Sequence, residues 1–160
     1  MALGCSARAG DAGAGWGKSI EWDELTMGGI LGIGTEIAEC LRIARMIERH
    51  GELFINRVYT ADEVRYCQSR RQSTQHFAAR WAAKEAVLKA LGIGTRRGMA
   101  WTDIEIRESS SGQPSVAVRG AIKDIVEQLG VAKVLVSVAH CRTHATAYAL
   151  ALGREKVDTE

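Results

Sequence analysis

Residues 81–92 constrain this chain more than any other segment, because they place charges on a helix that is otherwise small and apolar. Glu85 and Lys89 are four residues apart and share a helix face, and Arg80 pairs in the same way with Lys84. A carboxylate that can hold a divalent metal, beside cations that can hold phosphate, is typical of phosphoryl-type transfer. The simpler interpretation is an ion pair between residues four apart, which stabilises a helix by about 0.2–0.5 kcal/mol.

The composition is that of a globular domain. Of the 160 residues, 46% are hydrophobic and 25% are charged, and a chain of this length suits one domain with its own core. No apolar run approaches the roughly 18 residues of a membrane span, so we expect no membrane association. The cysteines form no CxxC pair, which argues against a disulfide framework and indicates a reducing cytosol; they are Cys5, Cys40, Cys67 and Cys141.

The distribution of charge is more informative than the net charge of +2. Residues 42–97 carry 12 Lys or Arg against 5 Asp or Glu, a local net charge of +7. This excess favours an acidic partner or a phosphorylated ligand. A nucleic-acid-binding module also fits the charge, but aromatic residues make up only 6% of the chain, so surfaces for stacking bases are scarce and we expect no nucleic acid.

The chain divides into an extension and a core. Residues 1–27 are rich in Ala, Gly and Ser, carry 2 basic and 4 acidic residues, and show no sustained apolar period. Such a segment buries too little apolar surface to offset its ordering entropy, so we predict a mobile extension without a signal-peptide pattern. Met27 directly precedes the first apolar run and is a candidate start. We place the folded domain at residues 28–154.

Periodicity and capping signals predict an α+β fold in which helices pack on an antiparallel sheet. The order β-α-α-α-β-β-α-β-β contains hairpins and no regular βαβ alternation. Gly51 ends the first helix, a capping box of Thr60 and Glu63 opens the second, and Thr74 caps the third. Strands are predicted at residues 29–37, 103–107, 115–119, 133–140 and 145–152, and helices at residues 39–50, 60–71, 74–91 and 121–129.

A lone carboxylate ends the glycine-rich first strand. The glycines between residues 28 and 34 are followed by no Gly-Lys-Ser/Thr and form no P-loop, so we interpret them as sites of close packing. Glu36 is costly to bury at the end of an apolar strand unless it is paired or coordinated. If the fold brings it to Glu85, the two form the two-carboxylate site that Mg²⁺ prefers.

Two further groups each have an ordinary and a functional interpretation. His140 ends a buried strand, where it is either a hydrogen-bonded histidine or part of an active site. A zinc site formed by His140 and His144 is not favoured, because no thiols lie at a recognised zinc-binding spacing. Arg42, Arg45 and Arg49 lie at i, i+3 and i+7 on one helix. They form either a solvated face or a docking stripe for an acidic helix.

Blocks of sequence in order along the chain resemble the holo-[acyl-carrier-protein] synthase family, the short group of 4′-phosphopantetheinyl transferases. The resemblance covers residues 29–152, nearly all of the core, and the helix discussed above is its strongest block. The blocks read GIGTEIAE (32–39), FINRVYTADE (54–63), FAARWAAKEA followed by KALG (77–92), DIEI (103–106), GQP (112–114) and VSVAH (136–140).

The resemblance implies a 4′-phosphopantetheinyl transferase-like fold and a magnesium-dependent reaction in fatty acid biosynthesis. The 4′-phosphopantetheine arm of coenzyme A passes to a serine of apo acyl carrier protein, and adenosine 3′,5′-bisphosphate is released. It also implies a homotrimer with sites between neighbouring subunits. We expect this enzyme to work in the cytoplasm.

The resemblance also implies roles for particular residues. Glu36 and Glu85 match the metal-binding carboxylates. The base that deprotonates the serine is Glu85, a metal-bound water or His140. The residues implied in catalysis are Glu85, Lys89 and His140. Those implied in binding coenzyme A are Arg80, Lys84, Lys89 and His140, with Lys89 on the pyrophosphate. The acidic helix of the carrier is expected to face Arg42, Arg45 and Arg49.

The main departure from the family is Glu36, where an aspartate is usual. The additional methylene lengthens the side chain by about one bond, which bears on rate and metal preference. Trp81 also replaces a usual phenylalanine. An alternative function is therefore a catalytically impaired homologue that still binds carrier protein or coenzyme A.

Overall fold

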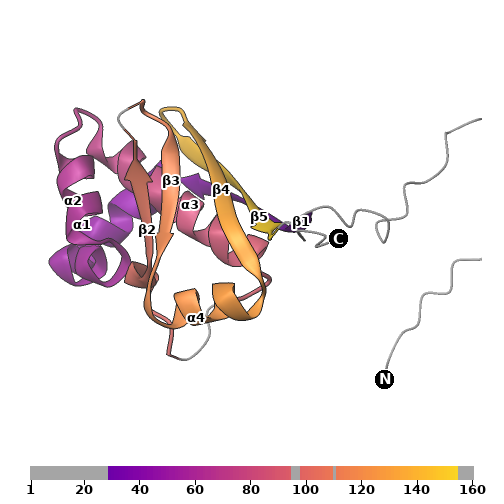
Figure 1. The fold of residues 1–160 in the computed structure, drawn as a ribbon. Coiled ribbons are helices and arrows are strands. Elements are labelled where there is room, and N and C mark those ends of the chain that lie inside the picture. Colours follow the sequence, from indigo (N-terminus) through magenta and orange to yellow (C-terminus); the bar gives the residue numbers. More distant parts are fainter. Residues whose placement is uncertain (1–28, 95–97, 110, 155–160) are drawn as a thin grey trace, which may run out of the picture.

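The elements follow one another in the predicted order and form an α+β fold (Figure 1). The computed structural model describes residues 29–94, 98–109 and 111–154, and the predicted extension of residues 1–27 lies outside them. The helices are α1 (Cys40–Val58), α2 (Ala61–Gln68), α3 (Ser73–Ala90) and α4 (Gly120–Gln128), with a short 3₁₀ helix η2 (Trp101–Asp103). The strands are β1 (Ile30–Glu39), β2 (Ile104–Glu108), β3 (Pro114–Val118), β4 (Val131–His140) and β5 (His144–Gly153).

The strands form two antiparallel sheets where the sequence predicted one. β5 lies between β1 and β4 in a three-stranded sheet, and β2 pairs with β3 in a two-stranded one. β3 contacts β4 without forming a ladder with it. The predicted class is confirmed, because every strand pair is antiparallel. None of the helices in the described ranges combines the length and the apolar character of a membrane span.

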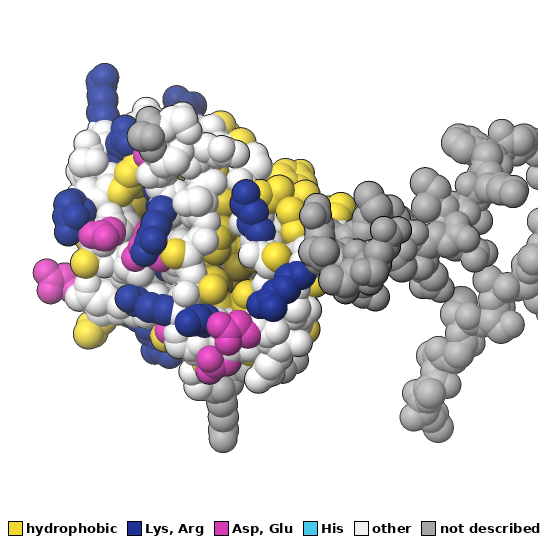
Figure 2. Space-filling view, viewed as in Figure 1, with side chains coloured by type: hydrophobic (Ala, Val, Ile, Leu, Met, Phe, Trp, Pro, Cys, Tyr) yellow, Lys and Arg dark blue, Asp and Glu magenta, His cyan; other side chains and the backbone are white. Residues whose placement is uncertain are grey.

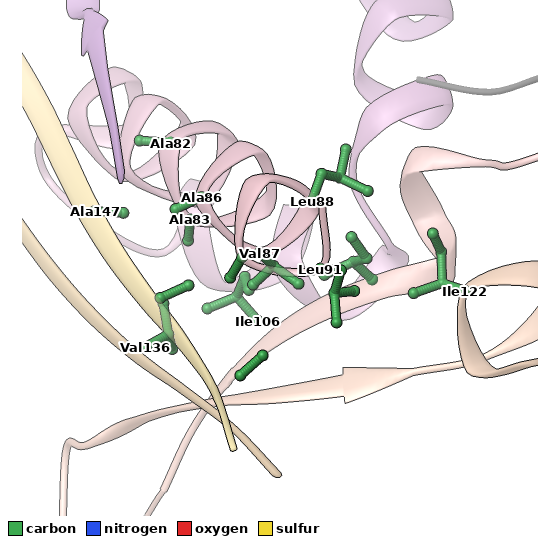
Figure 3. Packing of buried hydrophobic residues seen from close by; sticks show 14 of the residues in the cluster. Ala82, Ala83, Ala86, Val87, Leu88, Leu91, Ile106, Ile122, Val136 and Ala147 are labelled. Carbon is green, nitrogen blue, oxygen red and sulfur yellow. The ribbon is translucent and has the colours of Figure 1, made fainter. Parts of the chain in front are cut away.

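α3 is the central helix and packs on the three-stranded sheet (Figures 1 and 3). Its Ala82 and Ala86 are fully buried and belong to one core cluster with Ala147 of β5 and Val136 of β4. A second cluster packs α1 and α2 against the N-terminal half of α3. Small side chains between α3 and β5 let the two backbones approach closely, so the position of α3 on the sheet is tightly defined.

Two glycines of β1 let this strand touch α3 directly, as the sequence predicted. A Cβ atom on Gly34 would lie 1.9 Å from the carbonyl oxygen of Ala86, and one on Gly32 would lie 2.0 Å from that of Ala90. Both contacts are far shorter than van der Waals distances, so only glycine fits. Glu36 follows Gly34 by two residues on the same face of the strand, and the contact therefore sets its position beside α3.

We expect Gly34→Ala to destabilise the fold by about 1–3 kcal/mol, because the added methyl group must push α3 away from β1. Gly94→Ala is the matched control, since a Cβ atom there meets nothing within 4 Å. Urea-induced unfolding of both variants measures the difference. Equal stability of the two variants would contradict the tight contact.

α1 continues past its predicted end. Gly51 has a φ of 54° and a ψ of −136°, a conformation that favours glycine and interrupts the helix where the sequence placed its end. The chain then resumes helical geometry and buries Phe54 and Val58. The second half of α1 was not predicted, because long-range packing of these two side chains fixes it.

Two helix starts test the capping predictions. The box that opens α2 is confirmed: the Glu63 N–H donates to Thr60 Oγ1 at 3.3 Å, and the Thr60 N–H donates to Glu63 Oε2 at 2.9 Å. The predicted cap of α3 at Thr74 is wrong, because the helix begins one residue earlier and Gln72 occupies the N-cap without a side-chain hydrogen bond. Tertiary packing, including the buried Phe77, stabilises this end in place of a cap.

Candidate functional site

A lysine and a carboxylate meet where β1 contacts α3. Lys89 Nζ donates a hydrogen bond of 2.7 Å to Glu36 Oε2 and one of 3.0 Å to the carbonyl oxygen of Thr35. The side chain of Lys89 is 52% exposed and that of Glu36 is 22% exposed. The pair therefore lies at the surface, where a ligand can reach it.

Glu85 lies within electrostatic reach of this pair. Burial raises the pKa of Glu85, and the negative charge of Glu36 raises it further, whereas Lys89 and Arg42 lower it. The pKa of Lys89 is raised, first of all by its hydrogen bond to Glu36. The structure thus brings Glu36, Glu85 and Lys89 together, in a carboxylate–lysine cluster whose two carboxylates repel each other.

This donor set suits Mg²⁺. Magnesium usually binds one or two carboxylates and fills its other positions with water or substrate phosphate. Within the residues that the structure describes, no three His, Cys, Asp or Glu side chains gather into a metal-holding group. Glu36 and Glu85 would hold the ion, and its charge would relieve the repulsion between them.

A second group of side chains gathers around the ring of Tyr66 on α2. The guanidinium carbon of Arg80 lies 4.1 Å from the ring centroid, and that of Arg70 lies 4.4 Å from it. The ring of His76 packs edge-on against Tyr66 at 5.6 Å, and the ring of His140 packs against His76 at 5.0 Å. We call Tyr66, Arg70, His76, Arg80 and His140 the tyrosine cluster; four of its side chains can carry positive charge.

Four members of the tyrosine cluster line a hollow of about 130 Å³: Tyr66, His76, Arg80 and His140. A larger hollow of about 530 Å³ shares Tyr66, Arg80, Glu108 and Gly112 with it. Arg80 is only 6% exposed, and its Nε finds no hydrogen-bond partner among the described residues. Arg80 and His140, both predicted to bind coenzyme A, therefore line one hollow and leave a buried donor for a ligand.

Lys84 is not available to a ligand, which corrects the expectation that it binds coenzyme A. Its fully buried ammonium group forms an ion pair of 2.7 Å with Glu63 and donates to the carbonyl oxygens of Val58 at 2.7 Å and Trp101 at 3.1 Å. These contacts use all three N–H groups of a lysine. Burial lowers the pKa of Lys84, and Glu63 opposes this shift. Lys84 instead ties α3 to α1, α2 and η2.

The three predicted stripe residues, Arg42, Arg45 and Arg49, are all exposed on the first half of α1. Leu41 beside them is 51% exposed, whereas Ile43 anchors the helix in the core. Since Arg42 lowers the pKa of Glu85, the stripe begins at the carboxylate–lysine cluster.

The carboxylate–lysine cluster and the tyrosine cluster face different ways. Arg80 and Glu85 are five residues apart on α3, so their side chains diverge by about 140° around the helix axis. Glu36 and His140 stand on the two outer strands of the sheet, with β5 between them. One chain therefore presents two separate clusters.

Reasoning from the sequence missed several members of these groups. Tyr66, Arg70 and His76 belong to no motif, and nothing in their spacing indicates that they meet. Glu63 was recognised only as part of a capping box. The signal for its second role was Lys84 itself, since a lysine among alanines on a core helix needs a buried acidic partner.

Comparison with known proteins gives a consistent result. The family model of the 4′-phosphopantetheinyl transferase superfamily matches residues 32–152. The holo-[acyl-carrier-protein] synthase of Rhodopirellula baltica is 47% identical to this chain over 119 residues, which cover 74% of this chain and 94% of that protein.

Solved structures agree with this result. The holo-[acyl-carrier-protein] synthase of Neisseria meningitidis matches with a TM-score of 0.71 and 30% identity, over 76% of this chain and 98% of that one. A holo-(acyl-carrier-protein) synthase of Bacillus anthracis, solved in complex with CoA (3′,5′-ADP), matches with a TM-score of 0.65 and 28% identity, over 79% of this chain and 99% of that one.

Proposed function

Because the chain belongs to the 4′-phosphopantetheinyl transferase superfamily, we propose that it acts as a holo-[acyl-carrier-protein] synthase. The 4′-phosphopantetheine arm of coenzyme A passes to a serine hydroxyl of apo acyl carrier protein, and adenosine 3′,5′-bisphosphate leaves. The observation that carries this proposal is the cluster of Glu36, Glu85 and Lys89, which opens at the surface beside the arginines of α1.

We assign the reaction to fatty acid biosynthesis in the cytoplasm, carried out by a domain of residues 28–154. The free thiols Cys40, Cys67 and Cys141 agree with a reducing compartment.

The roles proposed for the residues come from the family resemblance and agree with their contacts. Glu36 and Glu85 would hold Mg²⁺, and the bound ion would supply positive charge to the pyrophosphate and to the phosphorus under attack. Lys89 releases Glu36 Oε2 and binds the pyrophosphate with the same ammonium group. Arg80 and His140 bind the third phosphate of coenzyme A, for which the buried Nε of Arg80 is a free donor.

Mass spectrometry of apo carrier protein tests the function directly. The carrier is incubated with the full chain, coenzyme A and Mg²⁺, and we expect its mass to increase by one phosphopantetheine. Chelation of the metal should stop the reaction, and added Mg²⁺ should restore it. Binding of coenzyme A or carrier without any mass increase would instead identify the impaired homologue, in which Glu36 is the altered ligand.

We expect Arg45→Glu and Arg49→Glu each to raise the KM for the carrier by about tenfold, because a reversed charge opposes an acidic helix. Arg42 is a poorer test, since it also influences Glu85. The exposed Lys123→Glu on α4 is the control. The effect should shrink at high salt, and an unchanged KM for the carrier would identify the stripe as a solvated face.

The outer face of the three-stranded sheet supports a homotrimer. Leu31, Ile33 and Ile37 of β1 are 53–68% exposed, and Tyr148 of β5 is 56% exposed. Figure 2 shows hydrophobic side chains gathered on the side of the molecule where Figure 1 labels these strands. An apolar face of this kind marks an interface. We propose that neighbouring copies cover it and join the carboxylate–lysine cluster of one copy to the tyrosine cluster of another.

Ile33→Glu is expected to dissociate this assembly, because the carboxylate would be buried without a partner in the interface. Sedimentation should give the mass of three 17.4 kDa chains for the wild type and of one chain for the variant. Transfer activity should fall with the assembly. Leu53→Glu, at an 83% exposed position on α1, should change neither quantity. A wild-type chain that sediments as a monomer would contradict the proposal.

A further inference from the structure

His76 and His140 form a pair that the proposed reaction uses only in part. Their ring centroids lie 5.0 Å apart, and the ring planes meet at 68°. His76 stands in the first turn of α3, and His140 is the last residue of β4. His76 is half-buried and His140 is exposed, so a ligand that reaches His140 from solvent also approaches His76.

The surroundings of His76 are rich in positive charge. Arg70, Arg80 and His140 face it, and among the described residues Glu108 on β2 is the acidic group that acts on it. Glu108 is already paired with Arg70 at 3.1 Å. Burial lowers the pKa of His76, the three cationic neighbours lower it further, and Glu108 raises it. In the free protein these surroundings therefore favour the neutral form of His76.

The hollow beside the pair is lined by three side chains that can carry positive charge and by one carboxylate, that of Glu108, which is paired with Arg70. His76, Arg80 and His140 all line the hollow of about 130 Å³. Arg80 is 6% exposed, and its Nε has no acceptor within the described part of the chain. A dianion placed here would meet a buried guanidinium and two imidazoles, and its negative charge would favour the protonated form of the nearby histidine.

We propose that His76 joins Arg80 and His140 in a clamp for a dianionic phosphomonoester and takes up a proton when that group binds. The inference rests on the proposed function, in which the phosphomonoester is the 3′-phosphate of coenzyme A. His76 then makes the enzyme prefer coenzyme A over dephospho-coenzyme A. It also couples binding to pH. If one proton is taken up on binding, the affinity for the ligand falls by up to about tenfold for each unit by which the pH rises.

Isothermal titration calorimetry measures this proton directly. Adenosine 3′,5′-bisphosphate is titrated into the full chain at pH 7 in two buffers of different ionisation enthalpy, and adenosine 5′-monophosphate serves as the ligand without a 3′-phosphate. We expect net proton uptake with the bisphosphate that is absent with the monophosphate. His76→Phe keeps a ring against Tyr66, and His76→Gln keeps a polar group. Neither side chain titrates, so both variants should lose the uptake.

A matched control separates this site from other histidines. His50→Phe on the exposed face of α1 should leave proton uptake unchanged. In transfer assays, the ratio of kcat/KM for coenzyme A to that for dephospho-coenzyme A should fall about tenfold in His76→Phe, mainly through KM.

The inference is overturned if both His76 variants bind the bisphosphate with wild-type affinity and proton uptake. It is also overturned if the wild type takes up no proton. Failure of the proposed function gives a different result, namely no mass increase of apo carrier protein whatever the calorimetry shows.

Discussion

Replacing Glu85 with glutamine is expected to lower kcat for phosphopantetheine transfer by about a thousandfold, which is about 4 kcal/mol of transition-state stabilisation. The amide keeps the shape of the side chain and removes one of the two charges that hold the metal. The melting temperature should stay the same or rise slightly. Burial and Glu36 raise the pKa of Glu85, so its charge opposes folding at neutral pH.

Two measurements make this prediction specific. Glu127→Gln, at an exposed position on α4, should leave kcat unchanged. The sign of the pKa shift also predicts that Glu85→Gln is more stable than the wild type at neutral pH, and that this difference shrinks as the pH falls through the raised pKa of Glu85. Near-normal turnover in Glu85→Gln would contradict its role as a metal ligand.

Lys84→Met is expected to lower the free energy of unfolding by about 3–5 kcal/mol, because it leaves the carboxylate of Glu63 buried without its partner. Glu63 is 1% exposed and cannot turn to water, since it also accepts hydrogen bonds from the N–H groups of Thr60 and Ile106. Urea-induced unfolding measures the loss. Lys123→Met removes an exposed lysine 3.8 Å from Glu127 and should cost less than about 1 kcal/mol.

A double-mutant cycle completes this test. In Lys84→Met combined with Glu63→Gln no unpaired charge remains, so the double variant should recover part of the stability that Lys84→Met loses. A raised KM for coenzyme A with unchanged stability in Lys84→Met would contradict this structural role. It would support the assignment of Lys84 to coenzyme A binding that the family resemblance implies.

Helical spacing predicted which charged residues share a face of α3, but not which of these faces is buried. Glu85 with Lys89 and Arg80 with Lys84 have the same spacing and the same apolar neighbours. The first pair turned out to lie at an accessible edge beside β1, whereas Lys84 lies in the core. The difference depends on Glu63, 21 residues earlier on another helix, and local periodicity carries no information about such a distant partner.

Because local periodicity does not identify distant partners, the sequence also failed to predict the two separate sheets and the tyrosine cluster. The order of elements follows from local periodicity and turn signals, and it was predicted correctly. The division into two sheets depends on how β3 and β4 meet, and the tyrosine cluster joins α2, α3 and β4. Both are set by long-range packing. The carboxylate–lysine cluster was predictable because family blocks mark both of its halves.

The interruption at Gly51 divides α1 into two halves, and the half that we propose to face the carrier protein lies before it. Residues 40–50 carry the arginine stripe and are anchored by Cys40 and Ile43, while the turns after Gly51 are anchored by Phe54 and Val58. Because each half has its own buried side chains, we expect hydrogen exchange of the amides before Gly51 to differ from that of the amides after it. If the carrier protein docks on the stripe as we propose, changes at Arg45 and Arg49 would retune the choice of carrier, while the backbone that holds Glu36, Glu85 and Lys89 would stay as it is.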